Sequence, residues 1–70
     1  MSVCQEKTDL IGRVQRVLSE LVELLQHQRE AVTAGAENTV TAIDQQIELK
    51  FGEKERAMGA LQLHEQEHGC

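Results

Sequence analysis

Two long stretches of the chain, residues 3–32 and 40–68, repeat their apolar residues at intervals of three and four and are separated by one short break. This interval is typical of an amphipathic α-helix, because residues three or four apart share one face of a helix. A strand would instead alternate apolar and polar residues. The pattern therefore predicts two long helices and no sheet.

The break between the two stretches is short enough to decide how the helices pack. Gly35 suits the left-handed position just past a helix end, and Asn38 is a good N-cap for a following helix. A connection of only a few residues makes the two helices run antiparallel. We predict one all-α domain over residues 1–70, an antiparallel two-helix hairpin. Its expected parts are a helix at about 3–34, a turn at about 35–38 and a helix at about 39–67.

The apolar stripe of the first helix is wider than one partner helix requires. Its central row consists of Leu10, Val14, Val17, Leu21 and Leu24. Five more apolar residues widen this row: Ile11, Leu18, Leu25 and Val32 on one side, and Val22 on the other. A stripe of this width indicates at least two neighbouring helices. We therefore expect a homodimer in which two hairpins form a four-helix bundle. The expected self-association face consists of Ile11, Leu18, Val22 and Leu25.

The second helix has a weaker apolar face. Its expected inner row is Val40, Ile43, Ile47, Phe51, Met58 and Leu61. Lys54 falls on the same row, and in a hairpin that folds about residue 36 or 37 it lies level with the acidic part of the first helix. We expect Lys54 to pair with Glu20 or Glu23.

The size and composition of the chain also favour self-association. The chain has 70 residues, with one Phe and no Trp or Tyr, so its core must be aliphatic. Chains below about 70–80 residues rarely gain more than ~3–5 kcal/mol from a single core, and small proteins commonly add a staple or a second copy. A stable lone monomer is not expected.

The net charge of −5 opposes attraction to nucleic acid or to an anionic membrane. No stretch approaches the ~18 apolar residues of a membrane span, and the first residues lack the apolar run of a secretion signal. We expect a cytoplasmic protein that binds neither membranes nor nucleic acid. The alternative is a small RNA-binding regulator, in which Arg13 and Arg16 would form the basic strip.

The two ends of the chain hold the only residues with the spacing of metal ligands. His64 and His68 are four apart and share a helix face, and Cys70 follows two residues later. Antiparallel folding brings Cys4 to the same end, which would complete a set of two Cys and two His ligands of the kind zinc prefers. Two alternatives stay open: a disulfide between Cys4 and Cys70, and two free thiols.

The sequence contains no recognisable catalytic arrangement, such as a nucleophile next to a base with a third group to orient it. We therefore expect a non-enzymatic protein without a required cofactor. The predicted function is that of a small interaction protein, an adaptor or regulator, which acts through self-association and a helical docking face on a protein partner not identified by the sequence.

Overall fold

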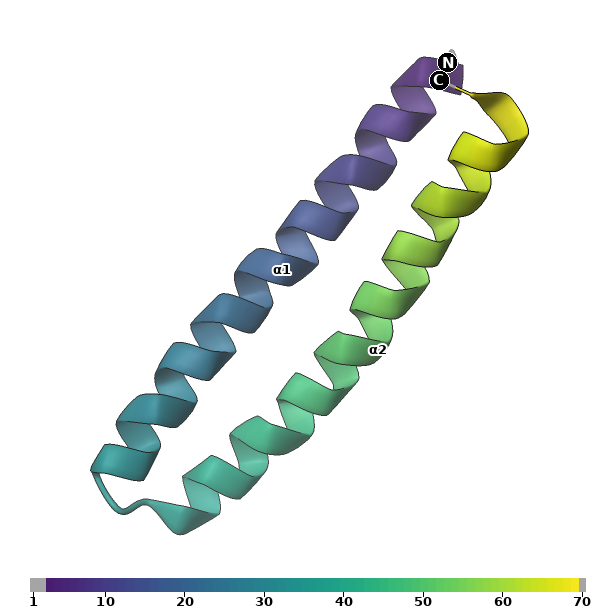
Figure 1. Cartoon of the computed structure of the whole chain (residues 1–70). Coiled ribbons are helices and arrows are strands. Elements are labelled where there is room, and N and C mark those ends of the chain that lie inside the picture. The colour runs from purple at the N-terminus through teal and green to yellow at the C-terminus, as the bar shows by residue number, and fades with distance from the viewer. Residues whose placement is uncertain (1–2, 70) are drawn as a thin grey trace.

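The computed structural model describes residues 3–69, with side chains for residues 5–69, and these residues form two long helices joined by a tight turn (Figure 1). Helix α1 spans Val3–Thr33 and helix α2 spans Glu37–His68. The helices lie side by side and antiparallel, in a rod with extents of 49 × 14 × 14 Å. The predicted all-α hairpin is confirmed, with helix ends within two residues of those expected.

The turn is closed by backbone hydrogen bonds that depend on Gly35. The amide of Gly35 donates to the carbonyl of Val32 at 3.1 Å, and the amide of Ala36 donates to the carbonyl of Ala31 at 2.9 Å. This pair of bonds is the Schellman motif, which satisfies carbonyls at a helix end when the next residue is left-handed. Gly35 has a φ of 71°, as the motif requires, so the predicted role of this glycine is confirmed.

The predicted N-cap of the second helix is wrong. The residue at this position is Ala36, which makes no side-chain capping bond, and Asn38 already lies within the first turn of α2. The Schellman motif continues directly into α2, because the amide of Val40 donates to the carbonyl of Ala36. The turn therefore ends two residues earlier than the capping preference of Asn38 suggests.

The two helices meet along rows of buried and half-buried residues spaced alternately three and four apart. The row in α1 is Lys7, Leu10, Val14, Val17, Leu21, Leu24, Gln28 and Ala31. The row in α2 is Val40, Ile43, Ile47, Lys50, Lys54, Ala57, Leu61 and His64. The centre of the core is formed by Val17, Leu21 and Ile47.

Two residues expected in the inner row of α2 lie elsewhere. Phe51 is 47% exposed and Met58 is 38% exposed. The inner row passes through Lys50 and Ala57 instead, each one residue earlier in the chain. One residue corresponds to about 100° of rotation around a helix, so both apolar side chains turn out of the seam between the helices.

Contacts between the helices define which residues lie level with one another. The pairs are Glu20 with Lys50, Gln28 with Asp44, and Lys7 with Glu65. The two residue numbers in each pair average 35 or 36, so the hairpin folds about one residue earlier than expected. The predicted pairing of Lys54 with Glu20 or Glu23 is wrong, because Lys50 binds Glu20 while Lys54 lies 3.5 Å from its neighbour Glu55.

Candidate functional site

Most of the large exposed hydrophobic side chains lie one residue after a position of the inner row. In α1, Leu18 follows Val17 and Leu25 follows Leu24; in α2, Met58 follows Ala57. Seven exposed residues share this relation, and we call them the apolar face: Ile11, Leu18, Val22, Leu25, Val32, Phe51 and Met58. Their exposed fractions range from 37% for Ile11 to 61% for Val32.

The seven residues lie on the same side of the hairpin although they come from two helices. A step of one residue turns clockwise when a right-handed helix is viewed from its N-terminus. Because α1 and α2 run in opposite directions, a forward step from the seam turns toward the same side of the rod in both. The apolar face is therefore one surface to which both helices contribute.

The opposite side of the hairpin is polar, because the residues that precede the inner row in α1 are mostly charged. A shallow groove of about 380 Å³ runs along this side and includes Glu20, Glu23, Leu49, Lys50 and Glu53 in its lining. We call this surface the charged face. Two strongly exposed hydrophobic side chains also lie on this side, Leu49 and Leu63, which are 70% and 54% exposed and precede Lys50 and His64 of the inner row.

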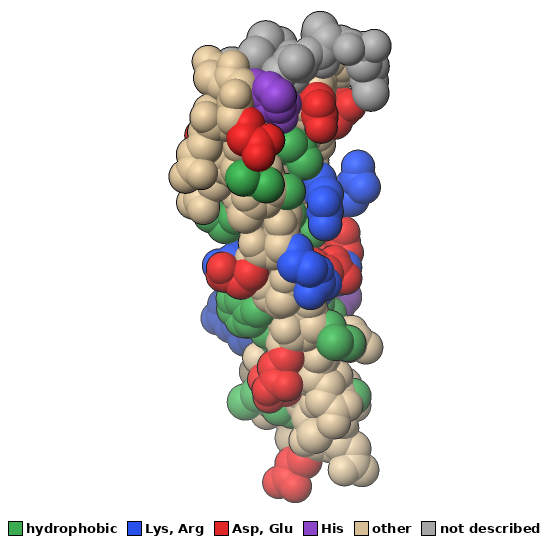
Figure 2. Space-filling model, turned by 90° about the vertical axis from the view of Figure 1, so that its right-hand side faces the viewer, with side chains coloured by type: hydrophobic (Ala, Val, Ile, Leu, Met, Phe, Trp, Pro, Cys, Tyr) green, Lys and Arg blue, Asp and Glu red, His purple; other side chains and the backbone are tan. Residues whose placement is uncertain are grey.

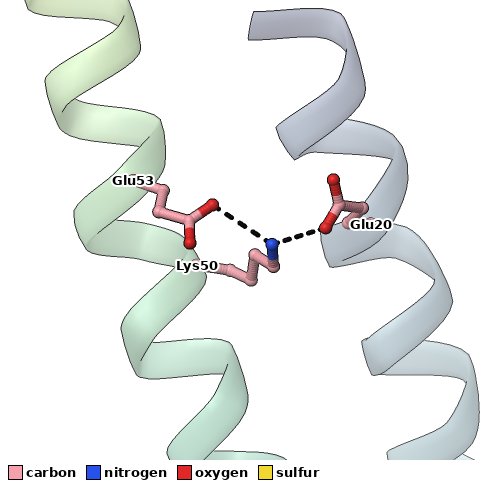
Figure 3. A network of polar contacts seen from close by, with 3 residues as sticks. All are labelled: Glu20, Lys50 and Glu53. Carbon is pink, nitrogen blue, oxygen red and sulfur yellow. Dashed lines mark hydrogen bonds and ion pairs between the residues drawn. The ribbon is translucent and has the colours of Figure 1, made fainter. Parts of the chain in front are cut away.

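An ion-pair network occupies the centre of the charged face (Figure 3). The Lys50 ammonium donates to the carboxylate of Glu20 across the helix seam and to Glu53 within α2, at 3.1 Å. These two hydrogen bonds raise the pKa of Lys50 above its ordinary value of 10.5. The network fixes the long side chain of Lys50 over this side of the seam, where it adds no apolar surface.

The four residues predicted as a self-association face are all exposed in the hairpin. Ile11, Leu18 and Leu25 lie on one side as expected, whereas Val22 lies on that same side and not on the other. The contribution of α2 was missed, because Phe51 and Met58 were placed in the seam. A strictly alternating interval of three and four residues would have identified the inner row of α2, because that row runs through Lys50 and Lys54.

The outer side of α2 differs from the apolar face. Figure 2 shows charged side chains of both signs and separate hydrophobic patches on this side. At the edge of the apolar face, the ammonium of the inner-row residue Lys54 lies 5.5 Å from the centre of the Phe51 ring and 3.5 Å from the Glu55 carboxylate. The stem of Lys54 can therefore cover apolar surface while its charge stays beside a carboxylate.

The predicted metal ligands are only partly described. His64 is 5% exposed, and its ring lies 4.9 Å from that of His68, while Nε2 of His64 has no hydrogen-bond partner among the described residues. The side chain of Cys4 and all of Cys70 lie outside the described residues. Within the part of the chain that is described, no group of three or more His, Cys, Asp or Glu residues could hold a metal ion. The two histidines are brought together, but the four-ligand zinc site stays a prediction.

The basic pair of the RNA-binding alternative is exposed on α1, with Arg13 and Arg16 both outside the inner row. Over residues 3–69, neither helix has a segment that is both long and apolar enough to cross a membrane. Comparisons with family models, with curated proteins and with solved structures found no match to this chain.

Proposed function

We propose that this chain is a small non-enzymatic interaction protein of the cytoplasm, which forms a homodimeric four-helix bundle through its apolar face and acts as an adaptor or regulator of a partner protein. The observation that carries this proposal is the apolar face itself. Seven large hydrophobic side chains from the two helices lie exposed on one side of a two-helix rod, beside exposed carboxylates of α2, whereas the other side has two exposed leucines among mostly charged residues of α1. Contiguous apolar surface of this kind is typical of protein interaction sites.

The thin core of the hairpin supports self-association. Five hydrophobic residues are buried among the described residues, and two of these are alanines. No large side chain among them is less than 2% exposed. A core this small gives little stabilisation against the conformational entropy of about 60 ordered helical residues, which is roughly 1–2 kcal/mol per residue. Covering the apolar face with another helical surface would supply the missing burial.

The surface area of the hairpin also fits a dimer. Its accessible surface is 5119 Å², whereas a compact monomer of 7.8 kDa has about 4,400 Å². The excess of about 700 Å² is close to the ~800 Å² that each partner buries in a standard protein interface. The elongated hairpin thus exposes more surface than a compact chain of its size, by about the amount that one side of a standard interface would cover.

Substitution of Leu25 by Glu tests the proposal. A carboxylate in the buried centre of the interface has no partner there, so we expect affinity to fall on the order of 100-fold or more, enough to leave monomers at micromolar concentration. The matched control is Leu49→Glu, which adds the same charge to an exposed leucine on the charged face. Sedimentation velocity should give a dimer mass for the wild type and for Leu49→Glu, and a monomer mass for Leu25→Glu.

Two results would count against the proposal. A wild-type protein that stays monomeric up to about 100 μM would exclude self-association as its mode of action. Equal dissociation of the Leu25→Glu and Leu49→Glu variants would mean that charge, and not the apolar face, decides assembly. Circular dichroism of each variant shows whether the helices persist, so that dissociation is distinguished from unfolding.

A further inference from the structure

The apolar residues of α1 are spaced almost symmetrically along the helix. Ile11 and Val32 lie equally far from a point between residues 21 and 22, and so do Leu18 and Leu25. Val22 lies next to that point. A row with this symmetry matches itself when a second copy is turned end for end, which is the requirement for an interface between identical surfaces related by a two-fold axis.

Resting on the self-association proposed above, we infer that the apolar face binds a second copy of this chain with α1 antiparallel to α1 of that copy. The two-fold axis lies beside Val22, perpendicular to the helices. In this arrangement Val22 meets Val22, Leu18 meets Leu25, and Ile11 meets Val32. The five large hydrophobic residues that are exposed in the described part of α1 then all face hydrophobic residues.

The position of Phe51 agrees with this axis. By the pairing across the seam, Phe51 lies level with residues 19–21 of α1, close to the same axis. The two α2 helices then also face one another, and Phe51, the one Phe in a chain without Trp or Tyr, approaches its own counterpart. Paired aromatic rings at the centre of an interface contribute about 0.5–1.5 kcal/mol beyond the area they bury.

The other face-to-face arrangement matches the two surfaces less well. With the two-fold axis parallel to the helices, α1 of one copy would pack on α2 of the other at the same level. The exposed hydrophobic residues of α2 on this face, Phe51 and Met58, reach only the levels of residues 12–21. Leu25 would then face the exposed polar stretch 44–46 of α2. Leu25 would then be buried against the Asp44 carboxylate, which already accepts a hydrogen bond from Gln28, whereas the axis beside Val22 places Leu25 against Leu18. The axis beside Val22 is therefore preferred.

Disulfide cross-linking tests the arrangement, because a cysteine on a two-fold axis meets itself. The experiment uses the full chain with Cys4 and Cys70 replaced by Ser, so that an introduced cysteine is the only thiol. We expect Val22→Cys to form a covalent dimer on oxidation, since bridged residues need Cα atoms within about 7 Å. Leu18→Cys alone should stay uncrosslinked, whereas an equal mixture of Leu18→Cys and Leu25→Cys should form a mixed dimer.

The controls separate failure of this arrangement from failure of self-association. If the Ser-substituted chain sediments as a monomer, both proposals are overturned. If it is a dimer and Val22→Cys does not cross-link, or Leu18→Cys cross-links with itself as readily, the arrangement is wrong and self-association stands. Should Val22→Cys not assemble when reduced, the mixed pair of Ile11→Cys and Val32→Cys at the edge of the face decides between the same outcomes.

Discussion

The apolar face and the charged face are built from the same two helices and differ by a shift of one residue relative to the seam. One residue after the inner row of α1, the chain has Leu18, Val22 and Leu25. One residue before it, the chain has Arg16, Glu20 and Glu23. In α1, a side of the hairpin is hydrophobic where the residue after each inner-row residue is apolar, and charged where the residue before it is charged. Total composition does not show this difference.

Charged groups at the centre of the charged face find ion-pair partners within one hairpin, whereas the hydrophobic side chains of the apolar face stay uncovered. Lys50 joins Glu20 and Glu53, so the central charges on that side have partners in the same chain. On the apolar side, Leu18, Val22 and Leu25 are 42%, 54% and 49% exposed, and the hairpin offers nothing to cover them. If the hairpin self-associates as proposed, the apolar face is the side with more hydrophobic surface for a second copy to cover.

The largest expected effect of this difference is on thermal stability as a function of concentration. If unfolding is coupled to dissociation, a hundredfold rise in protein concentration should raise Tm by on the order of 5–10 °C. Circular dichroism melts at several concentrations from about 2 to 200 μM measure the shift. The Leu25→Glu variant is the control and should melt at one temperature throughout. A wild-type Tm that does not change with concentration would show that the apolar face is not covered by a second copy.

The sequence was sufficient to predict the hairpin, because its main signals are local. The apolar interval sets the helices, and the need for a left-handed residue sets Gly35 at the turn. The position of the N-cap was not predictable in the same way. Asn38 has the stronger capping preference, but the backbone bonds of the Schellman turn begin α2 at Glu37, after Ala36.

The contents of the seam were harder to predict than its existence. Phe51 and Met58 were expected in the inner row because they are large and apolar, but the structure places Lys50 and Ala57 there. Long side chains explain the difference, since a lysine can lie in the seam while its ammonium reaches carboxylates at the edge. The contribution of α2 to the apolar face therefore could not be predicted without knowing which side of α2 faces α1.

A glycine on the outer side of the hairpin offers a change that leaves both faces intact. A Cβ built at Gly59 meets nothing within 4 Å, so Gly59→Ala should stabilise the folded chain by about 1 kcal/mol through helix propensity. Dimer affinity should not change, because the residue belongs to neither face. Urea denaturation measures the gain, and Gly35→Ala is the contrasting control, since its φ of 71° should make the same substitution destabilising. Destabilisation by Gly59→Ala would indicate that a second copy packs against this outer side.

The smallest expected effect concerns pH and the charged face. Because its hydrogen bonds to Glu20 and Glu53 raise the pKa of Lys50 in the folded chain, the stabilisation from this group is fully present below pH 10.5 and is lost as pH rises through the folded pKa. Lys50 is exposed enough for solvent to screen the pairs, so the wild-type Tm should fall by only about 1–3 °C more than that of Lys50→Met between pH 9 and pH 11.5. Sedimentation at both pH values should give the same dimer mass for both proteins. A variant that loses its dimer at either pH would show that the charged face also takes part in assembly, and that the two sides of the hairpin are not independent.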